Sequence, residues 1–399
     1  MLPQFDNTAN AFRYRSNADL KRAKVLFSTM GSPALTRIGM GLTKTAMGLG
    51  LPVKGLIKST IYRQFCGGET IEEAARTAAA LTPFGVGVAL DYGVEGASTE
   101  EAFDAAVPEF VRAVKFAASQ PAVPFIAVKV TGFARFGLLE ELHERSKAVT
   151  DRTPIAEISS DKVQEWQRVE RRIRTICEAA AGGDIRVLID AEESWIQQPI
   201  DDLVNALMET FNKERPVVYN TFQHYRHDRL TFLQASEARA KEKGYILGAK
   251  LVRGAYMEKE RRRAEALGYL SPIQPDKAAA DRDYDLAARF CLERLDHVAP
   301  FIGTHNEHSC AEAVRYMEEH SIAPAHPFVH FSQLYGMSDN ITFNLAAAGY
   351  NAVKYLPYGP VKDVIPYLMR RAQENTSVAG QTGRELGLIN KEMRRRRLD

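Results

Sequence analysis

The sequence has few cysteines, and no two of them are close enough in the chain to form a familiar metal or redox motif. Its 399 residues include four cysteines, Cys66, Cys177, Cys291 and Cys310, and none belongs to a CxxC pair. Widely spaced cysteines of this kind are typical of reduced thiols in a reducing compartment. We therefore expect neither a zinc site nor a disulfide framework.

The common glycine-rich nucleotide motifs are also absent. The stretches around Gly39, Gly48 and Gly85 each lack the third glycine of GxGxxG, and no GxxxxGK[ST] occurs. These absences disfavour a Rossmann nicotinamide site and a P-loop. The sequence has no GxSxG, and no cysteine lies at the end of a predicted strand, so a serine or cysteine nucleophile is not indicated.

No hydrophobic run is long enough to cross a membrane. The most apolar stretch, residues 33–58, is interrupted by Arg37, Lys44 and Lys54, well short of the roughly 20 apolar residues that a spanning helix needs. It can be read as helices packing on the main domain or as an amphipathic surface that contacts a membrane. The N-terminus lacks the apolar core of a signal peptide. We expect a cytoplasmic protein, with peripheral contact at the inner membrane face left open.

Charge of neither sign dominates. The net charge is +2, with 26% charged and 45% hydrophobic residues, which is ordinary globular composition. We therefore expect no nucleic-acid partner, and the basic run 394–397 reads as a solvated tail.

Eight short β-rich runs alternate with helical patterns along the chain. The runs are residues 86–93, 125–132, 186–193, 216–223, 246–256, 301–306, 326–333 and 351–359. Strands that alternate with helices indicate βαβ units and a parallel sheet. Eight units in succession predict a closed (βα)8 barrel over residues 81–399, preceded by a helical region at 1–80 that packs on it. An open doubly wound sheet is the alternative.

Nearly every predicted strand ends in polar side chains. They include Asp91, Lys129, Asp190, Glu192, Asn220, Gln223, Arg253, Tyr256, His305, Asn306, Gln333 and Tyr355. Active sites of such barrels lie at the C-terminal ends of the strands, so we expect an enzyme rather than a structural scaffold. The histidine pairs in HYRH (224–227) and HNEH (305–308) have metal-ligand spacing, but carboxylates are not concentrated beside them, and we predict no metal. A metal-dependent lyase, or a Schiff-base lyase using Lys129, is the rival enzyme class.

The stretch YLMRRAQENTS, residues 367–377, belongs to a helix predicted over 361–375. Tyr367, Arg370, Arg371 and Glu374 follow the i, i+3, i+4, i+7 spacing of one helical face. The two arginines suit a clamp on a carboxylate or phosphate after the last strand. They equally suit a surface pair with Glu374. The motif alone leaves both open.

An ordered set of motifs resembles the proline dehydrogenase family. The motifs are LDYGVEG, KVTG, IDAEE, YNTFQ, KLVRGAY, GTHN, YLPYG and YLMRRAQENTS, between about residues 84 and 377. The resemblance implies a barrel that holds FAD at its C-terminal face without a Rossmann domain. It implies oxidation of L-proline to Δ1-pyrroline-5-carboxylate, the first step of proline catabolism, by hydride transfer to flavin N5, with electrons passed to a membrane quinone.

The resemblance also implies roles for individual residues. Arg370, Arg371 and Lys129 match residues that bind the substrate carboxylate, while Asp190 and Glu374 match residues that orient them. The residues that match contacts to the substrate ring are Tyr256, Tyr355, Tyr367 and Leu251, the last as an apolar floor residue. The residues that match contacts to FAD are Gln223, Lys250, Arg253, Thr304, His305 and Asn306.

Two positions bear on how this chain differs from relatives. Many bifunctional members carry arginine where this chain has Lys250, and lysine keeps the charge but not the planar guanidinium fork. Relatives that prefer hydroxyproline carry a smaller residue where this chain has Tyr355, so the tyrosine favours proline over the hydroxyproline alternative.

Overall fold

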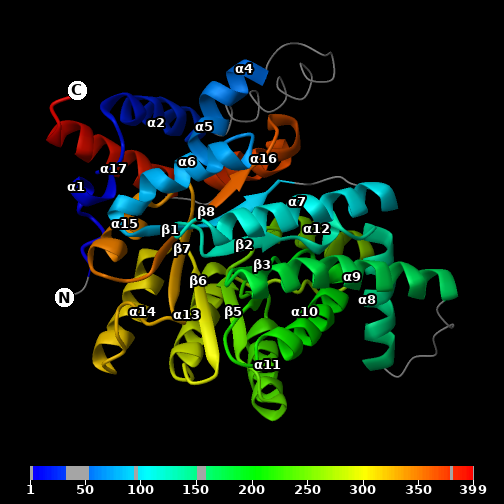
Figure 1. The fold of residues 1–399 in the computed structure, drawn as a ribbon. Coiled ribbons are helices and arrows are strands. Elements are labelled where there is room, and N and C mark those ends of the chain that lie inside the picture. The colour runs from blue at the N-terminus through cyan, green and yellow to red at the C-terminus, as the bar shows by residue number, and fades with distance from the viewer. Residues whose placement is uncertain (1–2, 33–53, 94–97, 151–158, 378–380, 399) are drawn as a thin grey trace. The chain divides into compact units, whose positions relative to one another are not determined.

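The computed structural model describes residues 3–32, 54–93, 98–150, 159–377 and 381–398. Eight strands form a closed barrel in chain order (Figure 1). They are β1 Val86–Tyr92, β2 Phe125–Val128, β3 Arg186–Ile189, β4 Val218–Gln223, β5 Leu247–Val252, β6 Val298–Gly303, β7 His330–Leu334 and β8 Ala352–Tyr358. Each predicted run contains or overlaps a strand, so the (βα)8 prediction is confirmed and the open sheet is excluded.

Helices follow the strands and precede the first one. Those that follow β1 and the later strands are α7 Glu100–Ala118, α8 Phe136–Thr150, α9 Ser160–Gly182, α10 Gln197–Phe211, α11 Arg229–Lys243, α12 Met257–Leu267, α13 Lys277–Leu292, α14 Glu307–Glu319, α15 Asp339–Ala347 and α16 Val361–Ser377. The helices before β1 are α1 Thr8–Ala11, α2 Asn17–Met30, α4 Lys54–Ile57, α5 Arg63–Phe65 and α6 Ile71–Leu81. Helix α17 Gln381–Arg395 follows α16. The helix predicted at 361–375 is confirmed as α16.

Several helices begin where a side chain accepts a hydrogen bond from a free backbone N–H. Ser16 and Asp19 form a reciprocal capping box at the start of α2. Thr99 caps α7, Asp276 caps α13 and Asn306 caps α14. These residues terminate the preceding loops and fix where each helix starts.

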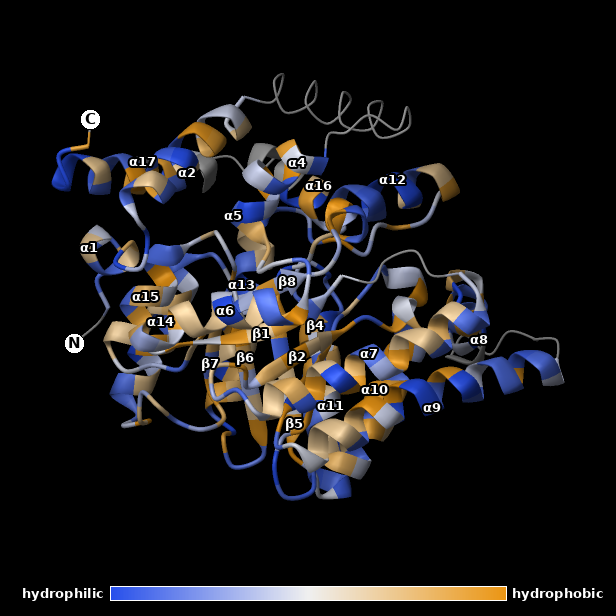
Figure 2. Cartoon of the chain, turned by 45° about the horizontal axis from the view of Figure 1, so that its top comes forward, coloured by the Kyte–Doolittle hydropathy of each residue, from blue (hydrophilic) through white to orange (hydrophobic). Residues whose placement is uncertain are grey.

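The chain divides into two compact units, of which one comprises residues 96–331. In this unit β2 to β6 pair in parallel, and their residues are mostly hydrophobic (Figure 2). The Phe125 ring on β2 contacts the rings of Tyr219 on β4, Phe301 on β6 and His330 at the start of β7. Burial lowers the pKa of His330 to about 3, so this imidazole is neutral.

The other unit comprises residues 1–95 and 332–399, with β1 and β8 paired from Val86 to Tyr92. Its apolar core joins α2, α5, α16 and α17 through Leu20, Phe27, Phe65, Leu368 and Ile389. Helices α2 and α17 lie side by side (Figure 1). The N-terminal helices thus share a core with C-terminal ones, while the predicted domain boundary at residue 80 stays a prediction.

A buried ionic cluster ties this core to β8. The Asp339 carboxylate accepts hydrogen bonds from Tyr14 Oη (2.8 Å) and Arg15 Nε (2.9 Å) and lies 2.9 Å from Lys354 Nζ. Burial alone would raise the pKa of Asp339, but attraction to Lys354 and Arg15 lowers it overall. Nearby Glu385 on α17 accepts from the Ser338 N–H at 2.5 Å. Burial raises the pKa of Glu385 to about 7.

The stretch predicted to contact a membrane is described only in part. None of the described helices combines the length and the apolar character needed to cross a bilayer. Residues 33–53, most of the stretch predicted either to pack on the barrel or to contact a membrane, lie outside the described residues.

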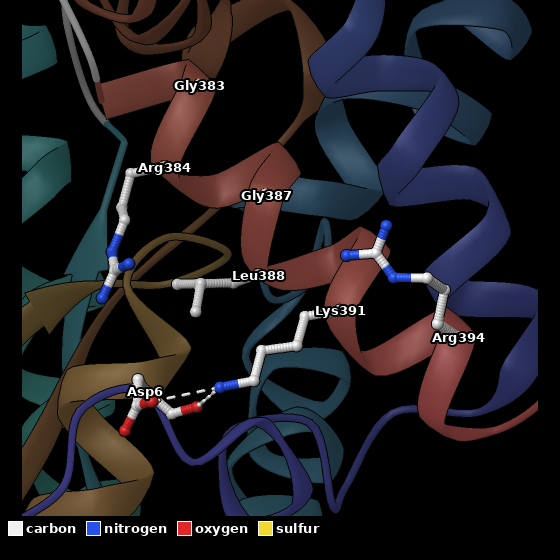
Figure 3. Close-up of a pocket in the computed structure, with 7 residues that line it drawn as sticks. All are labelled: Asp6, Gly383, Arg384, Gly387, Leu388, Lys391 and Arg394. Atoms are coloured by element: carbon white, nitrogen blue, oxygen red, sulfur yellow. Dashed lines mark hydrogen bonds and ion pairs between the residues drawn. The ribbon is translucent and has the colours of Figure 1, made fainter.

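A pocket runs along α17 (Figure 3) and is lined by Asp6, Gly383, Arg384, Gly387, Leu388, Lys391 and Arg394. It contains none of the predicted site residues.

Candidate active site

Two lysines share one carboxylate at the ends of β2, β3 and β5. Lys250 Nζ donates to Asp190 Oδ1 at 2.5 Å, and Lys129 Nζ lies 3.5 Å from Asp190 Oδ2. The exposed fraction of the side chain is only 8% for Lys250, 14% for Asp190 and 16% for Lys129. Lys129 directly follows β2, and Asp190 directly follows β3. Two ammonium groups that converge on one carboxylate at strand ends suit an anionic ligand.

Glu192 lies beside this group. Its Oε1 accepts a hydrogen bond from Thr131 Oγ1 at 2.6 Å, and its Oε2 lies 3.5 Å from Tyr256 Oη. Burial raises the pKa of Glu192 to about 7, although the bond from Thr131 and the charge of Lys129 oppose that rise. This carboxyl therefore changes protonation state near neutral pH. Predicted ring-contact residue Tyr256 is half-buried at the start of α12.

The end of β4 carries buried polar atoms that have no hydrogen-bond partner among the residues described by the structure. Gln223 is 2% exposed, and its Oε1 accepts no hydrogen bond from the described residues. The next residue, His224, is fully buried with neither ring nitrogen paired, and burial lowers its pKa to about 3. Buried polar groups without partners are rare in proteins and mark places where a ligand or water completes the bonding.

Arg253 follows β5 and is held by residues from α13, from the segment after β6 and from α14. Its Nε donates to Asp281 Oδ1 at 2.7 Å, its Nη1 to Thr304 Oγ1 at 2.7 Å and its Nη2 to Ser309 Oγ at 2.9 Å. The guanidinium carbon also lies 4.3 Å from the ring centre of Tyr284. Arg253 is thereby fixed in orientation beside the end of β6.

The other predicted cofactor residues follow β6 directly. Thr304 Oγ1 accepts from Arg253 and from the Asn306 N–H at 3.1 Å. Asn306 Oδ1 accepts from the N–H groups of His308 and Ser309 and so caps α14. His305 is half-buried between them. The structure thus groups Thr304, His305 and Asn306, but it gives Asn306 a helix-capping function that the resemblance did not indicate.

Leu251 is the exception among the predicted residues of this unit. Neighbouring side chains on a strand point to opposite faces of the sheet. Since Lys250 reaches Asp190, alternation directs the fully buried Leu251 to the other face of β5, between its partners Phe222 and Ile302. The structure therefore does not bring Leu251 to the lysine pair, and its predicted place under the substrate ring stays a prediction.

The remaining predicted residues lie in the other unit. Tyr355 is 7% exposed on β8, opposite Ala89 of β1. On α16, Tyr367 is 8% and Arg371 7% exposed, and the Arg371 guanidinium carbon lies 5.0 Å from the Tyr367 ring centre. This cation–π contact confirms that residues 367 and 371 share a helical face. Arg371 is thus not a solvated surface residue.

Arg370 is half-buried beside Arg371. Glu374 falls within α16, but its side chain is outside what the structure describes, so the predicted contact with the arginines stays a prediction.

Glu192 is the notable residue that sequence reasoning left out of the site. It was among the polar residues at strand ends, and its signal was the alternation in IDAEE, which puts Asp190 and Glu192 two residues apart. In extended backbone that spacing directs both side chains to one side.

The comparison with known families agrees with the resemblance. A profile described as proline dehydrogenase matches residues 74–384. The chain belongs to the proline dehydrogenase family. It is an enzyme of the oxidoreductase class, as its relatives in this family are named.

Individual relatives extend over most of the chain. The carbapenem antibiotics biosynthesis protein CarD of Pectobacterium carotovorum is 33% identical over 343 residues, covering 86% of each chain. The hydroxyproline dehydrogenase of Rattus norvegicus is 32% identical, covering 97% of this chain and 93% of its own. Among solved structures, proline utilization A from Bdellovibrio bacteriovorus superimposes with a TM-score of 0.71 at 21% identity, covering 92% of this chain and 38% of that one. That likeness supports the barrel fold.

Proposed function

We propose that this proline dehydrogenase family member oxidises L-proline to Δ1-pyrroline-5-carboxylate with FAD as its cofactor. The observation that carries the proposal is the carboxylate-bridged lysine pair, Lys129–Asp190–Lys250, at the ends of three barrel strands. Strand ends are where barrel enzymes place their reactive groups. Two ammonium groups in a little-exposed site fit both the carboxylate of an amino acid and an electron-rich cofactor ring.

The residues present fit a flavin. Gln223 offers a buried amide whose oxygen accepts no hydrogen bond within the described part of the chain, and Lys250 offers a cation held by Asp190. The segment Thr304–His305–Asn306, with Arg253 locked onto it, supplies further polar groups that would hold the cofactor. When bound, FAD supplies the acceptor for the hydride that leaves the substrate carbon.

For the substrate, the chain offers cations at one end and tyrosines for the ring. We assign the carboxylate to Lys129, Arg370 and Arg371, by ion pairs that fix its orientation. We assign the ring contacts to Tyr256, Tyr355 and Tyr367, and the steadying of the two arginines to Glu374.

The cations also help to prepare the substrate amine. A positively charged, little-hydrated site disfavours the ammonium form of proline, and the neutral amine releases electron density as the hydride leaves. The protein thereby supplies orientation, exclusion of water and a bias toward the reactive protonation state.

Hydroxyproline is the second candidate substrate, because the rat relative that matches nearly the whole chain carries that name. Tyr355 argues for proline, since a buried aromatic ring leaves less room for a ring hydroxyl than a small side chain would. We assign electrons to a membrane quinone, and we place the protein in the cytoplasm with peripheral contact at the inner membrane face.

Turnover with defined substrates tests the proposal. Purified protein is given L-proline, trans-4-hydroxy-L-proline or D-proline, with a redox dye or a soluble quinone as acceptor, and the cyclic imine product is trapped with an aromatic amino aldehyde. We expect the highest kcat/KM with L-proline and none with D-proline. Higher kcat/KM with the hydroxylated substrate would favour the second candidate, and no reduction with either L-amino acid would refute both.

A further inference from the structure

The buried carboxyl of Glu192 connects two segments that each carry a proposed substrate contact. One is the turn that follows β2, where Lys129 precedes Thr131, and the other is the start of α12, where Tyr256 lies. Glu192 accepts from Thr131 Oγ1 on one side (2.6 Å) and faces Tyr256 Oη on the other (3.5 Å). At 4% exposure, it has little water to compete for those contacts.

The backbone of Glu192 is itself fixed. Its N–H donates to Gln197 Oε1 at 2.7 Å, and the Gln197 side chain donates in turn to Asp201 Oδ1 at 2.9 Å. All of these groups are buried. The carboxyl of Glu192 is therefore held at a defined point between the two segments, and it is not a mobile surface acid.

We propose that Glu192 is a positioning residue that sets the distance between the cationic end of the substrate site, at Lys129, and the ring contact at Tyr256. The inference rests on the proposed function and deepens it, because it names the group that makes the site fit a small cyclic amino acid. A shared acceptor restrains both segments, so a ring of one size is held while its carboxylate stays on the lysine.

The protonation state of Glu192 changes how strongly it holds these segments. The charged and titratable groups that face it are Lys129 directly after β2, Asp190 and Glu193 after β3, and Tyr256 just before α12. Burial is the largest influence and places the pKa near 7. The ionised form accepts from both hydroxyls more strongly than the neutral form does. We therefore expect substrate binding to tighten as pH rises through 7.

The experiment compares Glu192→Ala, Glu192→Gln, Thr131→Val and the adjacent control Glu193→Gln. Glu193 is also buried, and its carboxylate pairs with Lys259. The measurements are kcat and KM for L-proline against pH, and the Kd of cyclopentanecarboxylate, a ring acid that lacks the amine. Thermal melting checks that each variant folds.

We expect Glu192→Ala to raise KM and the Kd of cyclopentanecarboxylate by at least tenfold, with kcat within threefold of the parent. Glu192→Gln keeps a hydrogen-bond acceptor, so its KM and its Kd for cyclopentanecarboxylate should lie within threefold of the parent's at pH 6. It should lose the tighter substrate binding that the parent shows above pH 7. Thr131→Val should also raise KM and Kd, by a smaller factor, and it replaces Glu192→Ala in the test if that variant fails to fold. Glu193→Gln should leave kcat, KM and Kd within twofold of the parent's.

Two results would overturn the inference. One is an unchanged Kd for cyclopentanecarboxylate in Glu192→Ala or Thr131→Val, and the other is the same pH dependence of KM in Glu192→Gln and the parent. Failure of the proposed function is recognised separately, since the parent protein itself would then oxidise no L-proline.

Discussion

Replacing Asp190 by asparagine tests the electrostatic centre of the site. The carboxylate lies 2.5 Å from Lys250 and 3.5 Å from Lys129. At an effective dielectric constant of about 20, the two gross attractions are about 7 and about 5 kcal/mol, before the cost of removing the charges from water. Removing one partner of a buried pair typically costs about 3–5 kcal/mol, because the other charge stays buried without its counter-ion. The lysines retain some water contact, so we expect a loss of about 3 kcal/mol.

Denaturant unfolding followed by circular dichroism measures this loss, with Asp184→Asn as a control. Asp184 is 80% exposed and pairs with a half-exposed Arg215, so its replacement should cost less than about 1 kcal/mol. Adding Lys250→Met to Asp190→Asn should recover at least about 1 kcal/mol, since the nearer of the two charges that lost Asp190 is then gone. The reasoning is refuted if Asp190→Asn costs under 1 kcal/mol, or if the double variant is less stable than the single one.

Three further predictions concern the substrate and the buried carboxyl of α17. Arg370→Met and Arg371→Met should each lower kcat/KM for L-proline by a factor that corresponds to about 2–5 kcal/mol of transition-state stabilisation. A tenfold change or less in both variants would refute the assignment of these arginines to the substrate carboxylate. Tyr355→Ser should raise the kcat/KM ratio of 4-hydroxyproline to proline, and an unchanged ratio would exclude Tyr355 from specificity. Glu385, with its pKa raised from 4.5 to about 7, holds a proton in the folded state that the unfolded chain releases, so unfolding free energy should fall as pH rises between these values. Glu385→Gln should remove up to about 3 kcal/mol of that fall in denaturant titrations at pH 5 and 8, and an identical fall in both proteins would contradict it.

The strands could be predicted from the sequence because buried parallel strands are short, almost continuous apolar runs. Their ends were less certain. KVTG was predicted to continue β2, whereas the strand stops at Val128 and Val130–Gly132 forms a short 3-10 helix. That helix turns Thr131 toward Glu192, which no local pattern in the sequence indicates.

Contacts between residues close in the chain can be predicted from sequence spacing, whereas contacts between distant residues cannot. Asp190 and Lys250 are 60 residues apart, and their contact was not predicted, because the resemblance assigned Lys250 to the flavin and Asp190 to the substrate-carboxylate residues. Leu251 was assigned by position in a motif, whereas strand alternation, visible in the same motif, separates it from Lys250. Asn306 in THNEHS carries an N-cap signal that could have been read directly.

The most direct test of the central claim is the visible absorption spectrum of the natively purified protein before and after anaerobic L-proline. We predict a yellow protein with flavin bands near 1:1 with the chain, and bleaching of those bands by L-proline but not by D-proline. A protein that carries no flavin and takes none up from added FAD, or one whose flavin bands L-proline leaves unchanged, would contradict the account.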